Sequence, residues 1–96
     1  MEIRFLDLAQ AKLDEAVAYY NSELPGLGDD FLVQILKALD RIKQFPKAWH
    51  PYTKNTRRCL VRRFPYGVVY QILKDEILIV AIQNLHRKPD YLHDRI

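Results

Sequence analysis

The chain has few of the residues on which several common kinds of site depend. Its 96 residues include one cysteine, Cys59, one serine, Ser22, and three scattered histidines. A single cysteine excludes an internal disulfide, fits a reducing cytoplasm and cannot build a thiolate-rich zinc site. The three glycines form no phosphate-binding loop, and Ser22 does not lie in a nucleophile elbow. We therefore expect no metal site and no cofactor, and we interpret Cys59 as a packing residue.

Long apolar runs are also missing. The longest, Ile77 to Ile82, has the length of a strand, whereas a membrane-spanning helix needs about 20 apolar residues. The first ten residues show no basic region followed by an apolar stretch, as a signal peptide would. With 49% hydrophobic and 28% charged residues, the composition is typical of a globular protein. We expect one domain over residues 1–96, in the cytoplasm, without membrane association.

Charge is distributed unevenly along the chain. Residues 1–53 carry six Lys/Arg against eight Asp/Glu, a balance of −2, and residues 54–96 carry nine against four, a balance of +5. The two balances give the net charge of +3. A basic second half indicates a partner that is acidic or polyanionic, although an uneven solvated surface would look the same.

Hydrophobic periodicity predicts two helices early in the chain. Apolar residues recur every three or four positions from about Asp7 to Glu23, with Asp7 as the expected N-cap. After "LPGLG", Asp29 or Asp30 is expected to cap a second helix that ends before Pro46. The short break between the helices predicts a helical hairpin.

The remaining segments predict a sheet. Glu2 to Leu6 alternates polar and apolar residues, and "RRCLVRRF", "GVVYQIL" and "ILIVAIQN" are three further strands joined by tight turns. The segment "PKAWHPYTKNT" is expected to be an irregular connection. The predicted fold class is α+β with the order β-α-α-β-β-β, a helical hairpin packed on a small antiparallel sheet. Tyr70, in the middle strand, is interpreted as a core residue.

Basic and aromatic residues gather in the sheet region. An antiparallel meander would bring the end of the first strand close to residues 83–87, and arginine forks near an imidazole and tyrosines suit phosphodiesters or acidic groups. The expected phosphate- or target-binding residues are Arg58, Arg62, Arg63, Arg87 and Lys88. If the protein cleaves RNA by 2′-hydroxyl attack, the catalytic group would be Arg62, His86, Arg87 and Tyr91. Of Arg62 and Arg63, at least one would be ordinary solvated surface, and His86 could equally cap the last strand.

The segments "RFPYGVVY" and "HRKPDYL" resemble the C-terminal half of the RelE/ParE family, toxins of bacterial toxin–antitoxin pairs. The helical hairpin with its Tyr-Tyr pair and Gly-Asp-x-Phe helix start is similar to the same family, so that the resemblance covers nearly the whole chain. The RelE/ParE resemblance implies the fold predicted above. It also implies one of two activities, cleavage of messenger RNA inside the ribosome by RelE-like members or inhibition of DNA gyrase by ParE-like members.

Two positions depart from the nuclease pattern. Gly67 stands where RelE-like nucleases usually carry an arginine, and Leu60 where they often carry a lysine. Neither side chain can donate a proton or hold a phosphate, although Arg58, Arg62 and His86 could compensate. The resemblance therefore favours a growth-arresting, ParE-like toxin directed at gyrase, with the ribosome-dependent endoribonuclease as the alternative and a non-toxic nucleic-acid-binding module as a second alternative.

The resemblance also implies a cognate antitoxin as partner. A flexible, partly helical antitoxin segment would meet the basic sheet face and the helical hairpin, in a toxin–antitoxin hetero-oligomer. The expected antitoxin-binding residues are Tyr19, Leu32, Leu36 and Arg63. The apolar residues among them could instead belong to a wide core stripe.

Overall fold

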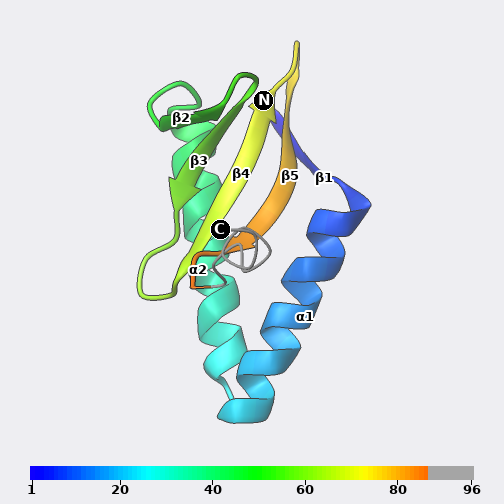
Figure 1. Ribbon diagram of the computed structural model, residues 1–96, viewed down its shortest axis with the longest axis vertical. Helices are drawn as coiled ribbons and strands as arrows, with labels where there is room; N and C mark the ends of the chain where they lie inside the picture. The colour runs from blue at the N-terminus through cyan, green and yellow to red at the C-terminus, as the bar shows by residue number, and fades with distance from the viewer. Residues whose placement is uncertain (87–96) are drawn as a thin grey trace, which may run out of the picture.

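The computed structural model of the protein describes residues 1–86 (Figure 1). Two helices and five strands follow one another along the chain. In order they are β1 (Glu2–Phe5), α1 (Asp7–Glu23), α2 (Leu27–Gln44), β2 (His50–Thr53), β3 (Thr56–Leu60), β4 (Tyr66–Ile72) and β5 (Glu76–Asn84). Neither helix is both long enough and apolar enough to cross a lipid bilayer in this part of the chain.

The five strands form one sheet in the order β1-β5-β4-β3-β2. β2, β3, β4 and β5 are antiparallel neighbours, and β1 pairs parallel with β5. The predicted α+β class with a helical hairpin on a sheet is confirmed, and the parallel edge strand makes the sheet mixed. β5 lies between β1 and β4, and its residues Ile77 to Ile82 are apolar at every position.

β2 is an edge strand within the segment that was expected to be irregular. All four of its residues are exposed, so it has no apolar alternation by which the sequence would reveal it. Thr53 and Thr56 close the β2–β3 turn, because the Thr56 hydroxyl lies 2.6 Å from the Thr53 hydroxyl and 3.2 Å from the Thr53 amide. Pro51 is tolerated because one side of an edge strand has no ladder to complete.

The two helices begin differently from the prediction, although they cover the expected segments. The N-cap residues are Leu6 and Gly26, neither of which makes a side-chain cap hydrogen bond, and α2 begins at Leu27, before Asp29. Gly26 has φ +89°, and the Asn21 side-chain oxygen accepts hydrogen bonds from the amides of Gly26 at 3.1 Å and Gly28 at 2.7 Å. Asn21 thus satisfies donors at the start of α2 that an aspartate cap was expected to serve.

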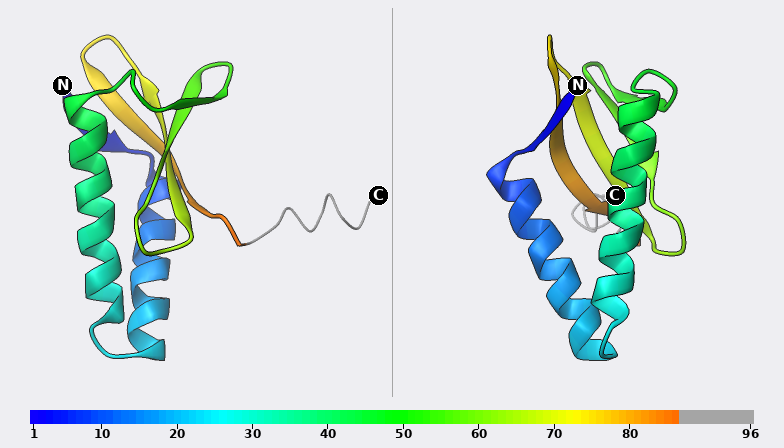
Figure 2. Two further views of the ribbon diagram at one scale, coloured as in Figure 1. Left: turned by 90° about the vertical axis from the view of Figure 1, so that its left-hand side faces the viewer. Right: turned by 180° about the vertical axis from the view of Figure 1, so that it is seen from behind.

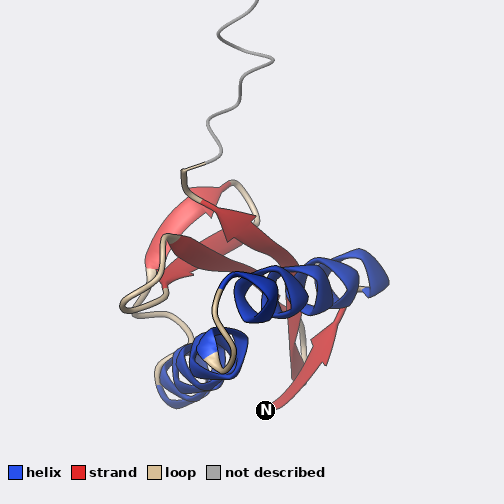
Figure 3. Ribbon diagram, turned by 90° about the horizontal axis from the view of Figure 1, so that it is seen from below, coloured by secondary structure: helices blue, strands red, loops and turns tan. Residues whose placement is uncertain are grey.

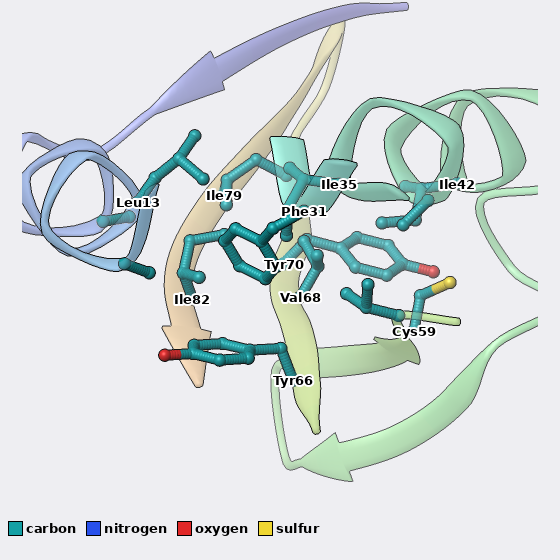
Figure 4. Packing of buried hydrophobic residues seen from close by; sticks show 14 of the residues in the cluster. Leu13, Phe31, Ile35, Ile42, Cys59, Tyr66, Val68, Tyr70, Ile79 and Ile82 are labelled. Carbon is teal, nitrogen blue, oxygen red and sulfur yellow. The ribbon is translucent and has the colours of Figure 1, made fainter. Parts of the chain in front are cut away.

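Both helices cover the same face of the sheet (Figures 2 and 3). α1 contacts β5, and α2 contacts β3 and β4. Figure 4 shows the core between these layers, with Tyr70 among Phe31, Ile42 and Cys59. Tyr70 and Cys59 are both fully buried, which confirms the interpretation of both as packing residues. The opposite face of the sheet carries no helix from residues 1–86, and we call it the open face.

Candidate functional site

β3 divides its side chains between the two faces of the sheet. Cys59 belongs to the helix-facing core, so the neighbouring residues Arg58 and Leu60 point to the open face. Leu60 is 51% exposed. The arginines of this strand therefore have separate roles, since Arg57 is on the same side as Cys59.

Arg57 is a structural residue. Its guanidinium donates hydrogen bonds to the backbone carbonyls of Lys47 at 3.1 Å and Trp49 at 2.8 Å. The hydroxyl of Tyr70 donates to the carbonyl of Pro46 in the same connection. Together Arg57 and Tyr70 fix the segment between α2 and β2, which explains why a buried face of the sheet contains a guanidinium and a phenol. The pKa of Tyr70 is raised to about 12 by burial. The nearby Arg57 acts in the opposite direction, but its effect is smaller.

Arg58 forms the centre of a polar cluster on the open face. Its Nη1 donates to the Gln83 side-chain oxygen at 2.8 Å, and its guanidinium carbon lies 4.6 Å from the centre of the Tyr52 ring. Gln83 Nε2 in turn donates to the Tyr52 hydroxyl at 2.7 Å. We call Tyr52, Arg58 and Gln83 the open-face cluster. It joins β2, β3 and β5, and it orients the guanidinium by a hydrogen bond and a cation–π contact.

Gly67 of β4 makes this arrangement possible. Gly67 is paired with both Leu60 and Gln83. A Cβ added to Gly67 would lie 3.0 Å from Cδ and 3.1 Å from Cγ of Arg58. The missing side chain therefore leaves the space in which the stem of Arg58 crosses β4 to reach Gln83 on β5.

Arg62 and Arg63 do not lie on a strand. β3 ends at Leu60, and both arginines are exposed in the connection to β4, so their predicted position on the strand is wrong. Within this connection Arg63 has φ 70°, in the left-handed region that a non-glycine residue rarely adopts. The Arg63 guanidinium carbon lies 5.9 Å from the centre of the Phe64 ring.

Phe64 connects this loop to the helical hairpin. Its ring centre is 5.2 Å from those of Tyr20 on α1 and Phe31 on α2. Tyr66 adds a fourth ring, 4.8 Å from Phe31. The loop that presents Arg62 and Arg63 is thus held at one end of the core by edge-to-face and tilted aromatic contacts.

The end of β5 lies beside the same loop, as predicted from the meander. The amide of Leu85 donates to the carbonyl of Pro65 at 2.8 Å. His86 is exposed, and its backbone amide donates to the Asn84 side-chain oxygen at 2.9 Å. The structure therefore brings the backbone of His86 towards the loop of Arg62 and Arg63. The predicted site residues Arg87, Lys88 and Tyr91 lie outside the described residues.

The expected antitoxin-binding residues of the hairpin fall into two groups. Tyr19 and Leu36 are 58% and 52% exposed, whereas Leu32 is half-buried and packs against the core. Leu32 therefore belongs to the core stripe, the alternative noted from the sequence. Val33 is also exposed and lies three residues before Leu36, on the same side of α2.

Tyr52 and Gln83 are the members of the open-face cluster that sequence reasoning missed. Tyr52 stands in the segment interpreted as irregular, and Gln83 was noted only as a neighbour of the loop. The sequence offered one signal, for Gln83. This polar residue follows the apolar run of β5, where a buried-strand pattern would continue with an aliphatic residue.

The cations of this region have no acidic partner within residues 1–86. The two ion pairs in that range are Arg4 with Glu76 at 2.8 Å and Lys12 with Glu15 at 3.6 Å. Arg58, Arg62 and Arg63 are therefore not neutralised by carboxylates of the described chain. Such a surface can receive an anionic group from a partner.

Comparison with known proteins agrees with this geometry. Residues 3–91 match the family model described as "ParE toxin of type II toxin-antitoxin system, parDE". A curated protein of Sinorhizobium fredii (strain NBRC 101917 / NGR234) named "Putative toxin Y4kP" is 28% identical over 87 residues, which cover 90% of each chain. A solved structure described as "Chromosomal ParDE TA system from P. aeruginosa" has the same fold, with a TM-score of 0.80, 20% sequence identity, and coverage of 88% of this chain and 96% of that chain. The chain therefore belongs to the ParE toxin family, and it is the toxin of a type II toxin–antitoxin system with an antitoxin as its partner.

Proposed function

We propose that this toxin arrests growth in the cytoplasm by binding and inhibiting DNA gyrase, and that a cognate antitoxin neutralises it in a hetero-oligomer. The match to the ParE family model supports this target. The proposal assigns to Arg58, Arg62 and Arg63, with Arg87 and Lys88, the binding of an anionic or acidic surface. It assigns no covalent chemistry to the protein.

The composition of the open face is the observation that carries this proposal. Leu60 and Gly67 stand at the two positions where the resemblance to nucleases would require cations, and the polar group beside them is the open-face cluster. The guanidinium of Arg58 and the amide of Gln83 hold their partner groups through hydrogen bonds. This chemistry suits recognition better than proton transfer to and from a ribose hydroxyl.

The endoribonuclease remains the second candidate because of one contact. The hydrogen bond between Leu85 and Pro65 brings the exposed His86 towards the loop that carries Arg62. An imidazole and a guanidinium at one end of the sheet are the groups that a 2′-hydroxyl attack would use.

Two assays on the purified protein separate these activities. A gyrase supercoiling assay is expected to show inhibition, while a reconstituted translation assay is expected to leave messenger RNA intact. The variant His86→Ala is expected to keep its effect on gyrase, because the proposal gives the imidazole no proton to carry. Codon-dependent cleavage that His86→Ala abolishes, with supercoiling unaffected, would replace the gyrase proposal by the nuclease.

A further inference from the structure

The open face has an unusual combination of one oriented cation and apolar surroundings. Register places Val69 beside Arg58, and Val69 is buried without belonging to the helix-facing core. Leu60, on the same face of β3 as Arg58, is 51% exposed, and Tyr52, whose ring contacts the guanidinium, is 44% exposed. The surface therefore offers one charge-assisted donor in a mainly apolar setting.

The guanidinium of Arg58 has donors to spare. A guanidinium has five N–H groups, and the contact to Gln83 engages Nη1. No carboxylate among residues 1–86 forms an ion pair with it. The contact with the Tyr52 ring fixes the plane of the fork, which reduces the entropy lost when a planar anion binds to its free edge.

We propose that the open-face cluster is a docking site for a carboxylate side chain carried between apolar residues on the antitoxin. The inference rests on the toxin–antitoxin function and names the chemistry by which the partner reaches this face. A planar carboxylate matches the fork of Arg58, and apolar neighbours of that carboxylate match the exposed Leu60 and the Tyr52 ring. A nucleic acid fits less well, because its regularly repeated phosphates call for a row of cations. Of the two guanidiniums on this face, Arg4 is paired with Glu76, which leaves Arg58 with the exposed Leu60 beside it.

Gly67 is the positioning residue of this site. It contributes no side chain, yet a methyl group there would lie 3.0 Å from Cδ of Arg58, so that the Arg58 stem would have to move by a few tenths of an ångström. Gly67→Ala therefore keeps the charge of Arg58 but displaces the fork from Gln83 and Tyr52. Arg58→Gln removes the charge and leaves the space at Gly67 open.

The test uses two peptides blocked at both ends, one of alternating leucine and glutamate and one of alternating leucine and glutamine. Each is titrated into the ¹⁵N-labelled protein at low salt while the side-chain amide signal of Gln83 is followed by NMR. The glutamate peptide is expected to shift this signal and to bind about tenfold more tightly than the glutamine peptide. Arg58→Gln is expected to lose this preference and Gly67→Ala to reduce it, whereas Lys12→Gln, an equal loss of charge on α1, is expected to keep it.

Several outcomes would overturn the inference. The two peptides could bind equally, Lys12→Gln could weaken binding as much as Arg58→Gln, or a short single-stranded oligonucleotide could bind here more tightly than the glutamate peptide. The last result would assign the site to nucleic acid. Because gyrase inhibition is measured separately, failure of peptide docking leaves the gyrase proposal standing, and failure of gyrase inhibition leaves peptide docking to be judged by its own titration.

Discussion

The buried hydroxyl of Tyr70 makes the stability of the fold depend on pH. Its pKa is about 12, raised chiefly by burial, whereas an unfolded chain has a tyrosine pKa of about 10. Below pH 10 the phenol is protonated in both states, and its contribution to stability is complete. Between pH 10 and 12 the phenol loses its proton in the unfolded state but keeps it in the folded state. This ionisation stabilises the unfolded state, so the free energy of unfolding falls.

The variant Tyr70→Phe isolates this contribution. At neutral pH it is expected to be less stable by about 1 kcal/mol, because the Pro46 carbonyl loses its hydrogen-bond donor. Between pH 10 and 12 the wild type is expected to lose about 2–3 kcal/mol more than the variant. Urea unfolding across this range measures both effects, with the exposed Tyr19→Phe as control. If the free energy of unfolding depends on pH in the same way for the wild type and Tyr70→Phe, the Tyr70 hydroxyl is not the source of this pH dependence.

Arg63 has a backbone conformation that favours glycine. With φ 70°, the arginine costs about 1 kcal/mol relative to a residue without a Cβ. Arg63→Gly is therefore expected to raise the free energy of unfolding by about 0.5–1 kcal/mol while weakening gyrase inhibition or antitoxin binding. Arg62→Gly, at a position without positive φ, is expected to lower stability by about 0.5–1 kcal/mol instead. If Arg63→Gly destabilises the protein, the side chain stabilises the loop and its proposed binding role loses this support.

At the scale of elements, the hairpin depends on two glycines for different reasons. A Cβ on Gly28 would lie 2.1 Å from the Val17 carbonyl, whereas one on Gly26 would meet nothing within 4 Å. Gly28→Ala is thus expected to force α1 and α2 apart at a cost of about 3 kcal/mol or more. Gly26→Ala is expected to cost about 1–2 kcal/mol, through its positive φ alone. Chemical denaturation would rank the two variants, and equal losses would contradict the close helix approach at Gly28.

Elements with an internal apolar pattern were predictable, and those without one were not. α2 and β5 have stripes or runs of apolar residues that reflect their burial, so both were placed within a few residues. β2 is exposed along its whole length and is held by its pairing with β3 and by the Thr53–Thr56 turn. Such a strand forms only because its neighbour is already in place, which no local pattern in the sequence reports.

The candidate site was partly predictable for a similar reason. The sequence identified Arg58, Arg62 and Arg63 by their charge. It did not indicate that Arg57 is bound to backbone carbonyls, or that Arg58 crosses Gly67 to reach Gln83. These contacts depend on the register of three strands and on which face each side chain occupies, and a shift of one residue would reverse them.

At the scale of the whole molecule, the fold separates charge into layers. Residues 7–44, which form the helices, contain four Lys/Arg and seven Asp/Glu, a balance of −3, and residues 50–84 contain six and two, a balance of +4. Because both helices cover one face of the sheet, the acidic and basic halves of the sequence become two sides of the molecule. Long-range attraction of a polyanion should therefore act from the sheet side, independently of the specific docking at Arg58.

Two variants with the same net charge test this separation. Lys54→Glu, in the β2–β3 turn, and Lys12→Glu, on α1, each lower the net charge from +3 to +1. On a heparin column Lys54→Glu is expected to elute at a lower salt concentration than Lys12→Glu, because it weakens the field of the basic layer. Thermal melts would establish that both variants are folded. Elution of both at the same salt concentration would mean that retention follows net charge alone, and the layered arrangement would then have no part in attracting a polyanion.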